Sequence, residues 1–271
     1  MIRPAICNEL FEGWTLARTC EVVKKLGYEG LEIAPFTLAP RITDFTADQR
    51  REARQIIADA GLATVGLHWL LAKTEGFHQT SPAAATRQRT AGYLRALAEA
   101  TADLGGTLMV LGSPKQRDLA PGVTPEQGLE YAAEVLGAIL PALDAAKVDL
   151  CLEPLGPAET NFLNSLAEAD RLRAALDHPR VKLHLDVKAM STDPGGTIPE
   201  LIREYGLEAG HLHAQDPTTL QGPGMGPLDF GPILKAIAAS GYAGWTSVEV
   251  FDFTPGAEAI ASASIGTLRG R

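Results

Sequence analysis

The amino-acid sequence predicts a single (β/α)8 barrel over residues 1–271, and three observations lead to this prediction. Short apolar runs alternate with longer stretches of helical periodicity along the whole chain. No low-complexity linker and no long charge run divides the sequence into separate units. The length of 271 residues also fits one barrel domain, because such barrels have about 250 residues. An open doubly wound sheet is the alternative, but no glycine fingerprint follows the first predicted strand.

The strands are expected where four to six mainly apolar residues stand together. They are Pro4–Cys7, Gly30–Ile33, Ala63–Leu67, Thr107–Leu111, Asp149–Leu152, Val181–Leu185, Ala209–Leu212 and Trp245–Val250. Amphipathic stretches between them predict helices, among them Thr15–Leu26, Thr46–Ala60, Pro82–Leu104, Thr124–Ala146, Ser165–Leu176 and Phe230–Ser240. Gly27, Gly61, Gly105 and Gly241 each follow a helical run, where glycine adopts a left-handed cap at little cost.

The composition indicates a globular protein and argues against several functions. Apolar residues make up 45% and charged residues 21% of the chain, which is ordinary for a domain with a substantial core. A formal net charge of −9 argues against nucleic acid as a partner. No stretch approaches the roughly 20 apolar residues of a membrane span, and the first residues lack the pattern of a signal peptide. We therefore expect a cytoplasmic protein with no membrane partner, whose three cysteines are buried free thiols.

Four predicted strands end in a residue that can bind a metal ion, and these residues are Glu153, Asp186, His213 and Glu249. The carboxyl ends of the strands form the active site of such barrels. A parallel strand is buried on both faces, so a charge there is costly unless it is paired or coordinated. If only one of these carboxylates were present, a structural ion pair would explain it as well as a metal ion. Together they predict one divalent ion, and the carboxylate-rich set suits Mn²⁺ or Mg²⁺ better than a structural zinc site, with Co²⁺ and Zn²⁺ as alternatives.

The histidines of the seventh strand are assigned to different layers. His211 and His213 are two residues apart, so both point into the barrel. His213 is nearer the carboxyl end and is therefore the predicted ligand, whereas His211 lies one layer deeper. His184 has the same relation to Asp186, which makes it a second deeper residue, and a hydrogen-bonded core histidine is the alternative for both.

Further side chains near the predicted mouth are candidates for substrate contact. Trp69, next to His68, is expected to form an apolar wall with Phe36 and Trp14 on which a sugar stacks. Ordinary packing is the alternative for these aromatic residues. Glu32 ends the second strand on the mouth side, with structural pairing to a lysine or arginine as its alternative.

The segment Gln221–Gly226 follows the seventh strand, where many barrels bind phosphate. Its glycines have backbone N–H groups to offer, but no lysine or arginine stands nearby. A tight turn or a lid is therefore the preferred interpretation of this segment.

Several short motifs, in this order and spacing, resemble the xylose-isomerase-like barrels, a superfamily of sugar isomerases and epimerases that also contains the apurinic-site endonucleases. The resemblance covers essentially the whole chain. The motifs are Gly27–Ile33, Glu153-Pro154, Leu185-Asp186, His211-Leu212-His213, Gly224–Phe230, Gly241–Trp245 and Glu249.

Within this superfamily the chain is most similar in function to the ketose 3-epimerases of the tagatose and psicose type. Those enzymes have a second glutamate shortly after the fifth-strand ligand, and Glu159 stands in the matching place. They also have a substrate-binding histidine where this chain has Ala189, and an arginine after the seventh-strand histidine where this chain has Asp216–Thr219. Lys188 is a candidate for the contact that the missing histidine would make. The metal chemistry is thus expected to carry over better than the substrate.

The resemblance implies a metal-dependent sugar isomerase or epimerase that acts on a ketose or a related hydroxyketone through an enediolate. Glu153 and Glu249, on non-adjacent strands, would move the proton on opposite faces of the substrate. The alternatives are a metal-dependent dehydratase or lyase of a keto-sugar or inositol derivative, and a non-catalytic sugar-binding barrel. His68 matches one histidine of the endonucleases, but Ala189 and the acidic charge disfavour nuclease activity. A sugar or sugar acid is the expected partner, with a homodimer or homotetramer as the expected assembly.

Overall fold

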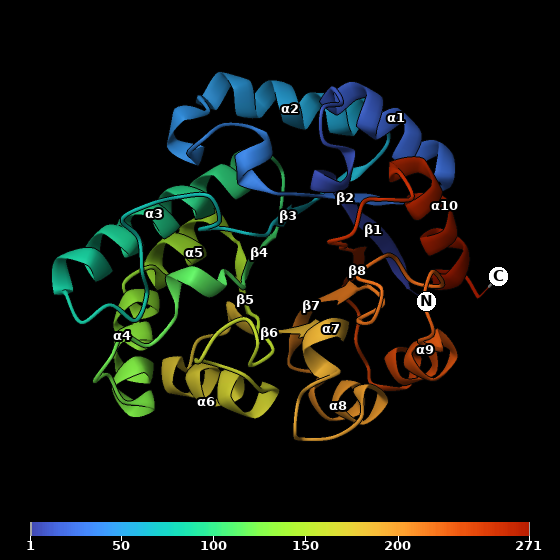
Figure 1. The fold of residues 1–271 in the computed structure, drawn as a ribbon. Coiled ribbons are helices and arrows are strands. Elements are labelled where there is room, and N and C mark those ends of the chain that lie inside the picture. The colour runs from blue at the N-terminus through green and yellow to red at the C-terminus, as the bar shows by residue number, and fades with distance from the viewer. Residues whose placement is uncertain (1, 271) are drawn as a thin grey trace.

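The computed structural model describes residues 2–270, which form a closed barrel of eight parallel strands surrounded by helices (Figure 1). Each strand pairs with its neighbours in sequence order, and β8 closes the barrel against β1. The strands are β1 (Arg3–Cys7), β2 (Gly30–Ile33), β3 (Ala63–Leu67), β4 (Leu108–Leu111), β5 (Asp149–Leu152), β6 (Val181–Asp186), β7 (Ala209–Ala214) and β8 (Trp245–Val248). The predicted (β/α)8 fold is confirmed, and all eight predicted strands are present with ends that differ by at most two residues.

The helices lie outside the barrel, as Figure 1 shows. They are α1 (Leu16–Leu26), α2 (Ala47–Asp59), α3 (Ala84–Asp103), α4 (Pro125–Gly137), α5 (Leu140–Ala146), α6 (Leu166–Leu176), α7 (Val187–Met190), α8 (Ile198–Tyr205), α9 (Phe230–Ala239) and α10 (Ala257–Leu268). Short 3-10 helices follow several strands, namely η1 (Asn8–Phe11), η2 (Pro35–Thr37), η3 (Ile42–Asp44) and η4 (Pro114–Gln116). Each of the four predicted glycine caps has a positive φ. Among residues 2–270, each helix is too short or too polar to cross a membrane.

The predicted helix Thr124–Ala146 is in fact two helices, so that prediction was wrong as a single element. α4 ends at Gly137 and α5 begins at Leu140. Pro141 stands at the start of α5 and has no backbone N–H to donate to the preceding turn. The proline therefore ends one helix and fits the first turn of the next.

Two apolar regions support the barrel end that holds the site. The larger lies between the strands and the surrounding helices. The smaller joins side chains from both sides of the barrel, on β1 and β8 and on β3 to β5, and consists of Ala5, Val65, Leu108, Val110, Cys151 and Trp245. Cys151 precedes Glu153 by two residues on the same face of β5, so the apolar filling lies directly below the charged residues. All three cysteines are free and buried, as predicted.

Candidate active site

The four residues predicted to bind a metal lie together at the carboxyl ends of β5 to β8. The Nδ1 atom of His213 is 3.2 Å from Oε2 of Glu249 and 4.0 Å from Oε1 of Glu153. Asp186 ends β6 beside His213 in the register of the sheet. One ligand atom each from Glu153, Asp186 and His213, together with one from His184, lie within 4.8 Å of one another. Glu249 is not part of this four-residue group and meets it through His213, whereas His184, which we had placed one layer deeper, belongs to the group.

The position of Glu153 depends on the segment that follows β4. A Cβ atom at Gly112 would overlap the carboxylate of Glu153, so only glycine leaves the space that this side chain occupies. The guanidinium of Arg117 is fully buried and donates to the carbonyl oxygens of Glu153 and Leu111, at 2.7 Å each. These charged hydrogen bonds join the ends of β4 and β5 and fix the backbone that carries Glu153. No sequence pattern distinguishes Arg117 from the other arginines of the chain.

The carboxylates of this group oppose one another. Burial, followed by the charges of Glu249 and Asp186, raises the pKa of Glu153 well above its ordinary value. Burial and the charge of Glu249 raise the pKa of Asp186 to about 6. Buried carboxylates that raise one another's pKa, next to the imidazoles of His184 and His213, are ligands that a divalent cation would stabilise in their ionised form. The residues present therefore fit the implied metal ion.

Glu249 is held in the ionised form by its neighbours. Burial alone would raise its pKa, but the imidazole of His213 and the Trp69 N–H hold the pKa of Glu249 at about 2. The Trp69 indole donates from Nε1 to Oε1 of Glu249 at 2.6 Å. Trp69 has a positive φ of 53°, which is uncommon for a bulky residue, so the chain after β3 adopts an unfavourable conformation where this indole meets the site.

Glu32 lies below the mouth and supports the histidines. Its side chain is fully buried, with Oε2 at 2.7 Å from Nε2 of His211 and Oε1 at 3.1 Å from Nε2 of His213. Burial opposes ionisation, but the two imidazoles keep the pKa of Glu32 well below its ordinary value. Its partners are thus histidines rather than the lysine or arginine that we considered. This arrangement leaves Nδ1 of His213 directed toward Glu153 and Glu249, while His211 lies in the deeper layer as the sequence indicated.

His68 connects the site to a carboxylate that the sequence analysis missed. The Nε2 atom of His68 is 3.0 Å from Oε2 of Glu9 and 3.9 Å from Oε1 of Glu249. Glu9 is the second residue after β1, in η1. A carboxylate just after a barrel strand was the signal that could have identified it, by the same reasoning that identified Glu153.

Glu159 and Lys188 form an ion pair at the rim. The Nζ atom of Lys188 is 2.5 Å from Oε1 of Glu159 and 4.9 Å from the centre of the Phe251 ring. Glu159, Glu153, Glu249 and other residues line a small cavity of about 60 Å³. Glu159 is thus on the site side of this pair, as expected from its place after β5.

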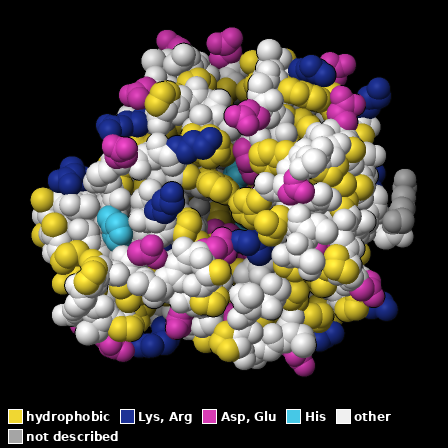
Figure 2. Space-filling model, in the orientation of Figure 1, with side chains coloured by type: hydrophobic (Ala, Val, Ile, Leu, Met, Phe, Trp, Pro, Cys, Tyr) yellow, Lys and Arg dark blue, Asp and Glu magenta, His cyan; other side chains and the backbone are white. Residues whose placement is uncertain are grey.

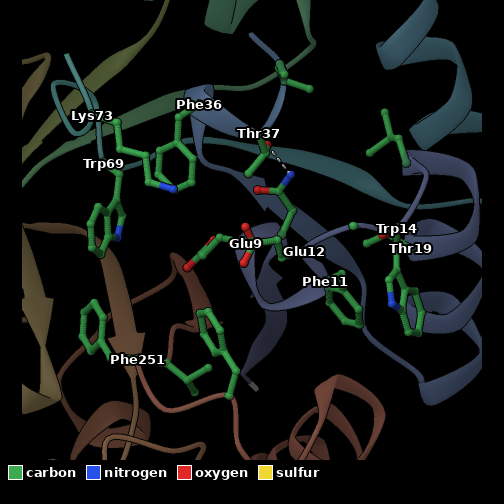
Figure 3. A pocket seen from close by; sticks show the side chains of 16 residues that line it. Glu9, Phe11, Glu12, Trp14, Thr19, Phe36, Thr37, Trp69, Lys73 and Phe251 are labelled. Atoms are coloured by element: carbon green, nitrogen blue, oxygen red, sulfur yellow. Dashed lines mark hydrogen bonds between the residues drawn. The ribbon is translucent and has the colours of Figure 1, made fainter. Parts of the chain in front are cut away.

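A much larger cavity, of about 500 Å³, lies on the other side of Trp69. It is lined by residues that follow β1, β2, β3 and β8, including Phe11, Trp14, Phe36 and Phe251. Figure 3 shows the Glu9 and Glu12 side chains between the Phe36 and Trp69 side and the Phe11 and Trp14 side. On the space-filling surface, a hollow near the middle of the face is bordered by hydrophobic and charged side chains (Figure 2). The predicted aromatic wall is therefore one side of a real cavity.

The glycine-rich segment after β7 is a tight turn, in agreement with the preferred interpretation. Asp216 accepts hydrogen bonds from the backbone N–H groups of Thr218 at 2.9 Å, Thr219 at 3.0 Å and Leu228 at 2.9 Å. A Cβ atom at Gly226 would overlap the Asp216 carboxylate. These donors flank Gln221–Gly226 and are already bound to an internal anion. Within the segment, Met225 donates its backbone N–H to the Gly222 carbonyl oxygen at 3.1 Å, which makes the turn.

The fold and the site define a closed parallel barrel whose buried carboxylates and imidazoles gather at the carboxyl ends of the strands. Residues 20–271 match the model of the xylose isomerase-like TIM barrel family. The chain belongs to this family, as its motifs indicated.

Two curated proteins, both with provisional names, match part of the chain. A hydroxypyruvate isomerase of Streptomyces coelicolor is 28% identical over 134 residues, covering 47% of this chain and 48% of that protein. A ketose 3-epimerase of Synechocystis is 31% identical over 146 residues, covering 52% of this chain and 46% of that protein. The chain thus spans about half the length of the curated relatives it matches.

Solved structures resemble the protein over its whole length. D-psicose 3-epimerase of Clostridium cellulolyticum H10 superposes with a TM-score of 0.86 at 22% identity, with 99% of each chain covered. The 3-keto-D-glucoside 4-epimerase of E. coli has a TM-score of 0.83 at 20% identity, with 100% of each chain covered. At these identities the superpositions establish the fold.

Proposed function

We propose that the protein is a metal-dependent sugar isomerase or epimerase that acts on a ketose or a related hydroxyketone. The observation that carries the proposal is the placement of Glu153 and Glu249 on either side of His213, at the opening of a buried group of metal-binding side chains. The names of the relatives support it, since ketose 3-epimerase and hydroxypyruvate isomerase reactions both move a proton on a carbon next to a carbonyl group.

Glu153, Asp186, His213 and Glu249 would hold the ion, for which Mn²⁺ is our first choice. A bound divalent cation supplies polarisation of the substrate carbonyl and its neighbouring hydroxyl. One of the two glutamates removes the carbon-bound proton and the other returns a proton on the opposite face, which inverts the carbon. Transfer on the same face between neighbouring carbons gives aldose–ketose isomerisation with the same residues.

The residues around this pair would orient the substrate. Trp69 fixes Glu249 through its N–H, and Glu32 fixes the ring of His213. Glu159 would accept from a substrate hydroxyl, with Lys188 holding its carboxylate in place.

Deuterium exchange tests this proposal, because exchange at the carbon next to the carbonyl reports proton abstraction even when the product is unknown. D-Fructose, D-tagatose, D-psicose and hydroxypyruvate are incubated with the protein and Mn²⁺ in D₂O and followed by NMR. We expect exchange that stops when a chelator removes the metal. Binding without exchange would instead support a sugar-binding barrel, and a product lighter by one water would support a dehydratase.

Common ketohexoses are expected to be poor substrates. Ala189 replaces the histidine of the epimerases, and its backbone N–H is occupied by Asp186 at 2.6 Å. Thr219, which stands in the segment that lacks the arginine, donates its backbone N–H to Asp216. The pocket therefore has fewer free donors for hydroxyl groups, and unpaired polar groups weaken transition-state binding. We expect kcat/KM for D-psicose, D-tagatose and D-fructose to stay below about 10⁴ M⁻¹s⁻¹; a higher value would show that these replacements matter little.

A further inference from the structure

Trp69 separates two cavities of very different size. Trp69 and Phe251 line both the small cavity at Glu153 and Glu249 and the large one beyond it. The indole ring lies between Phe36 and Phe251, with ring-centre distances of 6.1 Å and 5.7 Å. The large cavity is therefore the immediate neighbour of the reacting groups.

The large cavity has more room than the reacting carbons of a ketose require. Its volume of about 500 Å³ falls within the range of roughly 300–1,000 Å³ that is typical of pockets for sizeable small molecules. None of the four predicted metal ligands is among the residues that line it. A molecule that fills it while reacting at Glu153 and Glu249 must carry a second group, on the far side of Trp69.

The walls of this cavity suit a neutral sugar ring. Aromatic side chains from the segments after β1, β2 and β8 supply flat apolar surfaces, on which the C–H faces of a sugar pack. Lys73 has its Nζ 3.9 Å from the centre of the Phe36 ring and, among the described residues, no carboxylate partner. Glu12 on the opposite side is exposed and, within the described part of the chain, accepts no hydrogen bond. A positive and a negative side chain therefore face the large cavity together. This favours an uncharged molecule with many hydroxyl groups over an anion or a cation.

Building on the proposed function, we propose that the substrate is a glycosylated ketose. Its ketose unit lies at Glu153 and Glu249, and its second sugar ring fills the large cavity between Trp14, Phe36 and Phe253. The site has few free hydrogen-bond donors for the hydroxyl groups of the ketose unit. This agrees with a two-ring substrate, because binding free energy from the second ring replaces the missing contacts.

Disaccharides of D-fructose provide the test. Isomaltulose, leucrose and maltulose carry glucose on different hydroxyls of the fructose unit and keep the carbonyl group. Deuterium exchange next to that carbonyl is measured by NMR with the Mn²⁺-loaded protein, beside D-fructose itself. We expect at least one disaccharide to exceed D-fructose about tenfold in kcat/KM, since stacking on an aromatic wall and burial of the apolar face of the ring together contribute about that much.

Two variants assign the gain to the cavity. Phe253 lines it and is 38% exposed, so Phe253→Ala removes part of the wall with little effect on folding. Phe253→Ala should lower kcat/KM for the preferred disaccharide about tenfold and change that for D-fructose less than twofold. Leu207→Ala is the matched control, because Leu207 is a large apolar residue that is 77% exposed and does not line the cavity.

The outcomes separate this inference from the proposed function. Equal rates for D-fructose and all three disaccharides, or equal losses on both substrates in Phe253→Ala, would overturn the glycosylated substrate while leaving the isomerase proposal intact. If no ketose exchanges deuterium, the proposed function fails. The assignment of the large cavity is then tested by measuring sugar binding. Tryptophan fluorescence, to which Trp14 and Trp69 contribute, is then titrated with the same sugars. Tighter binding of a disaccharide than of D-fructose, lost in Phe253→Ala, supports the cavity assignment, and equal binding overturns it.

Discussion

The two halves of the barrel mouth have different chemistry. The half formed by β5 to β8 presents carboxylates and imidazoles on the strands themselves or on the residue just after a strand. The half formed by β1 to β3 contributes Glu9, Glu32 and His68 to the buried charges, and adds aromatic side chains on 3-10 helices and loops that follow the strands. Groups that must meet within a few tenths of an ångström are thus carried by the rigid part of the fold, and groups that shape a binding surface are carried by its loops. The difference implies that chemistry and substrate range can be altered separately.

The largest effect is expected from the two glutamates of the charged half. Glu153→Gln and Glu249→Gln keep the size of the side chain and remove its charge and its ability to take a proton. Each should lower kcat for deuterium exchange by about 10²–10⁴-fold. Circular dichroism and the melting temperature serve as controls for folding. Activity within tenfold of the wild type in either variant would remove that glutamate from the proton transfer.

His213 and His211 lie at different depths in the same half, so their variants should differ in metal affinity. His213→Ala should abolish Mn²⁺ binding in calorimetric titrations, because Nδ1 of His213 faces Glu153 and Glu249. His211→Ala removes the partner of Glu32 in the deeper layer, and should weaken Mn²⁺ binding only about tenfold while costing about 1–3 kcal/mol of stability. Equal losses of affinity in the two variants would contradict the assignment of layers.

The fold and the residues at the strand ends were predictable from the sequence, because both depend on local patterns. Alternating apolar runs locate the strands, and barrel topology then places Glu153, Asp186, His213 and Glu249 at one end without further information. That these residues converge is a structural observation, and their roles as ligands remain predictions.

The supporting contacts were not predictable, because they depend on how distant segments meet. Glu32 faces His211 and His213 across the barrel, from a strand 179 and 181 positions away in the sequence. Arg117 reaches two carbonyl oxygens from a loop whose conformation no periodicity encodes. The break between α4 and α5 differs from these, since Pro141 marks it in the sequence.

Gly112 offers a way to displace one carboxylate of the charged half without removing it. Gly112→Ala places a Cβ atom where the Glu153 carboxylate lies, so the carboxylate must move. We expect Mn²⁺ affinity to fall about 10–100-fold, as for other changes that reorient a ligand. Gly92→Ala is the matched control, because Gly92 lies in α3 with no atom within 4 Å of the added Cβ. Unchanged affinity in Gly112→Ala would show that the position of Glu153 is not critical for the metal.

The smallest effect is expected outside both halves, in the turn after β7, and it concerns stability rather than catalysis. Burial alone would raise the pKa of Asp216, but hydrogen bonds from the N–H groups of Thr219, Leu228 and Thr218 lower it below its ordinary value. A carboxylate whose pKa is lower in the folded state contributes stability above its unfolded pKa of about 3.9. This contribution is lost as the pH falls through the folded pKa.

Asp216→Asn removes the charge and turns an amide N–H group toward one of these donors. We expect a loss of about 1–3 kcal/mol in the free energy of unfolding at pH 7, measured by urea titration. The difference from the wild type should narrow below about pH 4, where the wild-type carboxyl group also takes up a proton. Glu99→Gln is the control, because Glu99 is exposed on α3 and makes no ion pair among the described residues. A difference that stays constant from pH 7 to pH 3 would mean that the charge of Asp216 does not stabilise the turn, and that the shape of the side chain alone orders it.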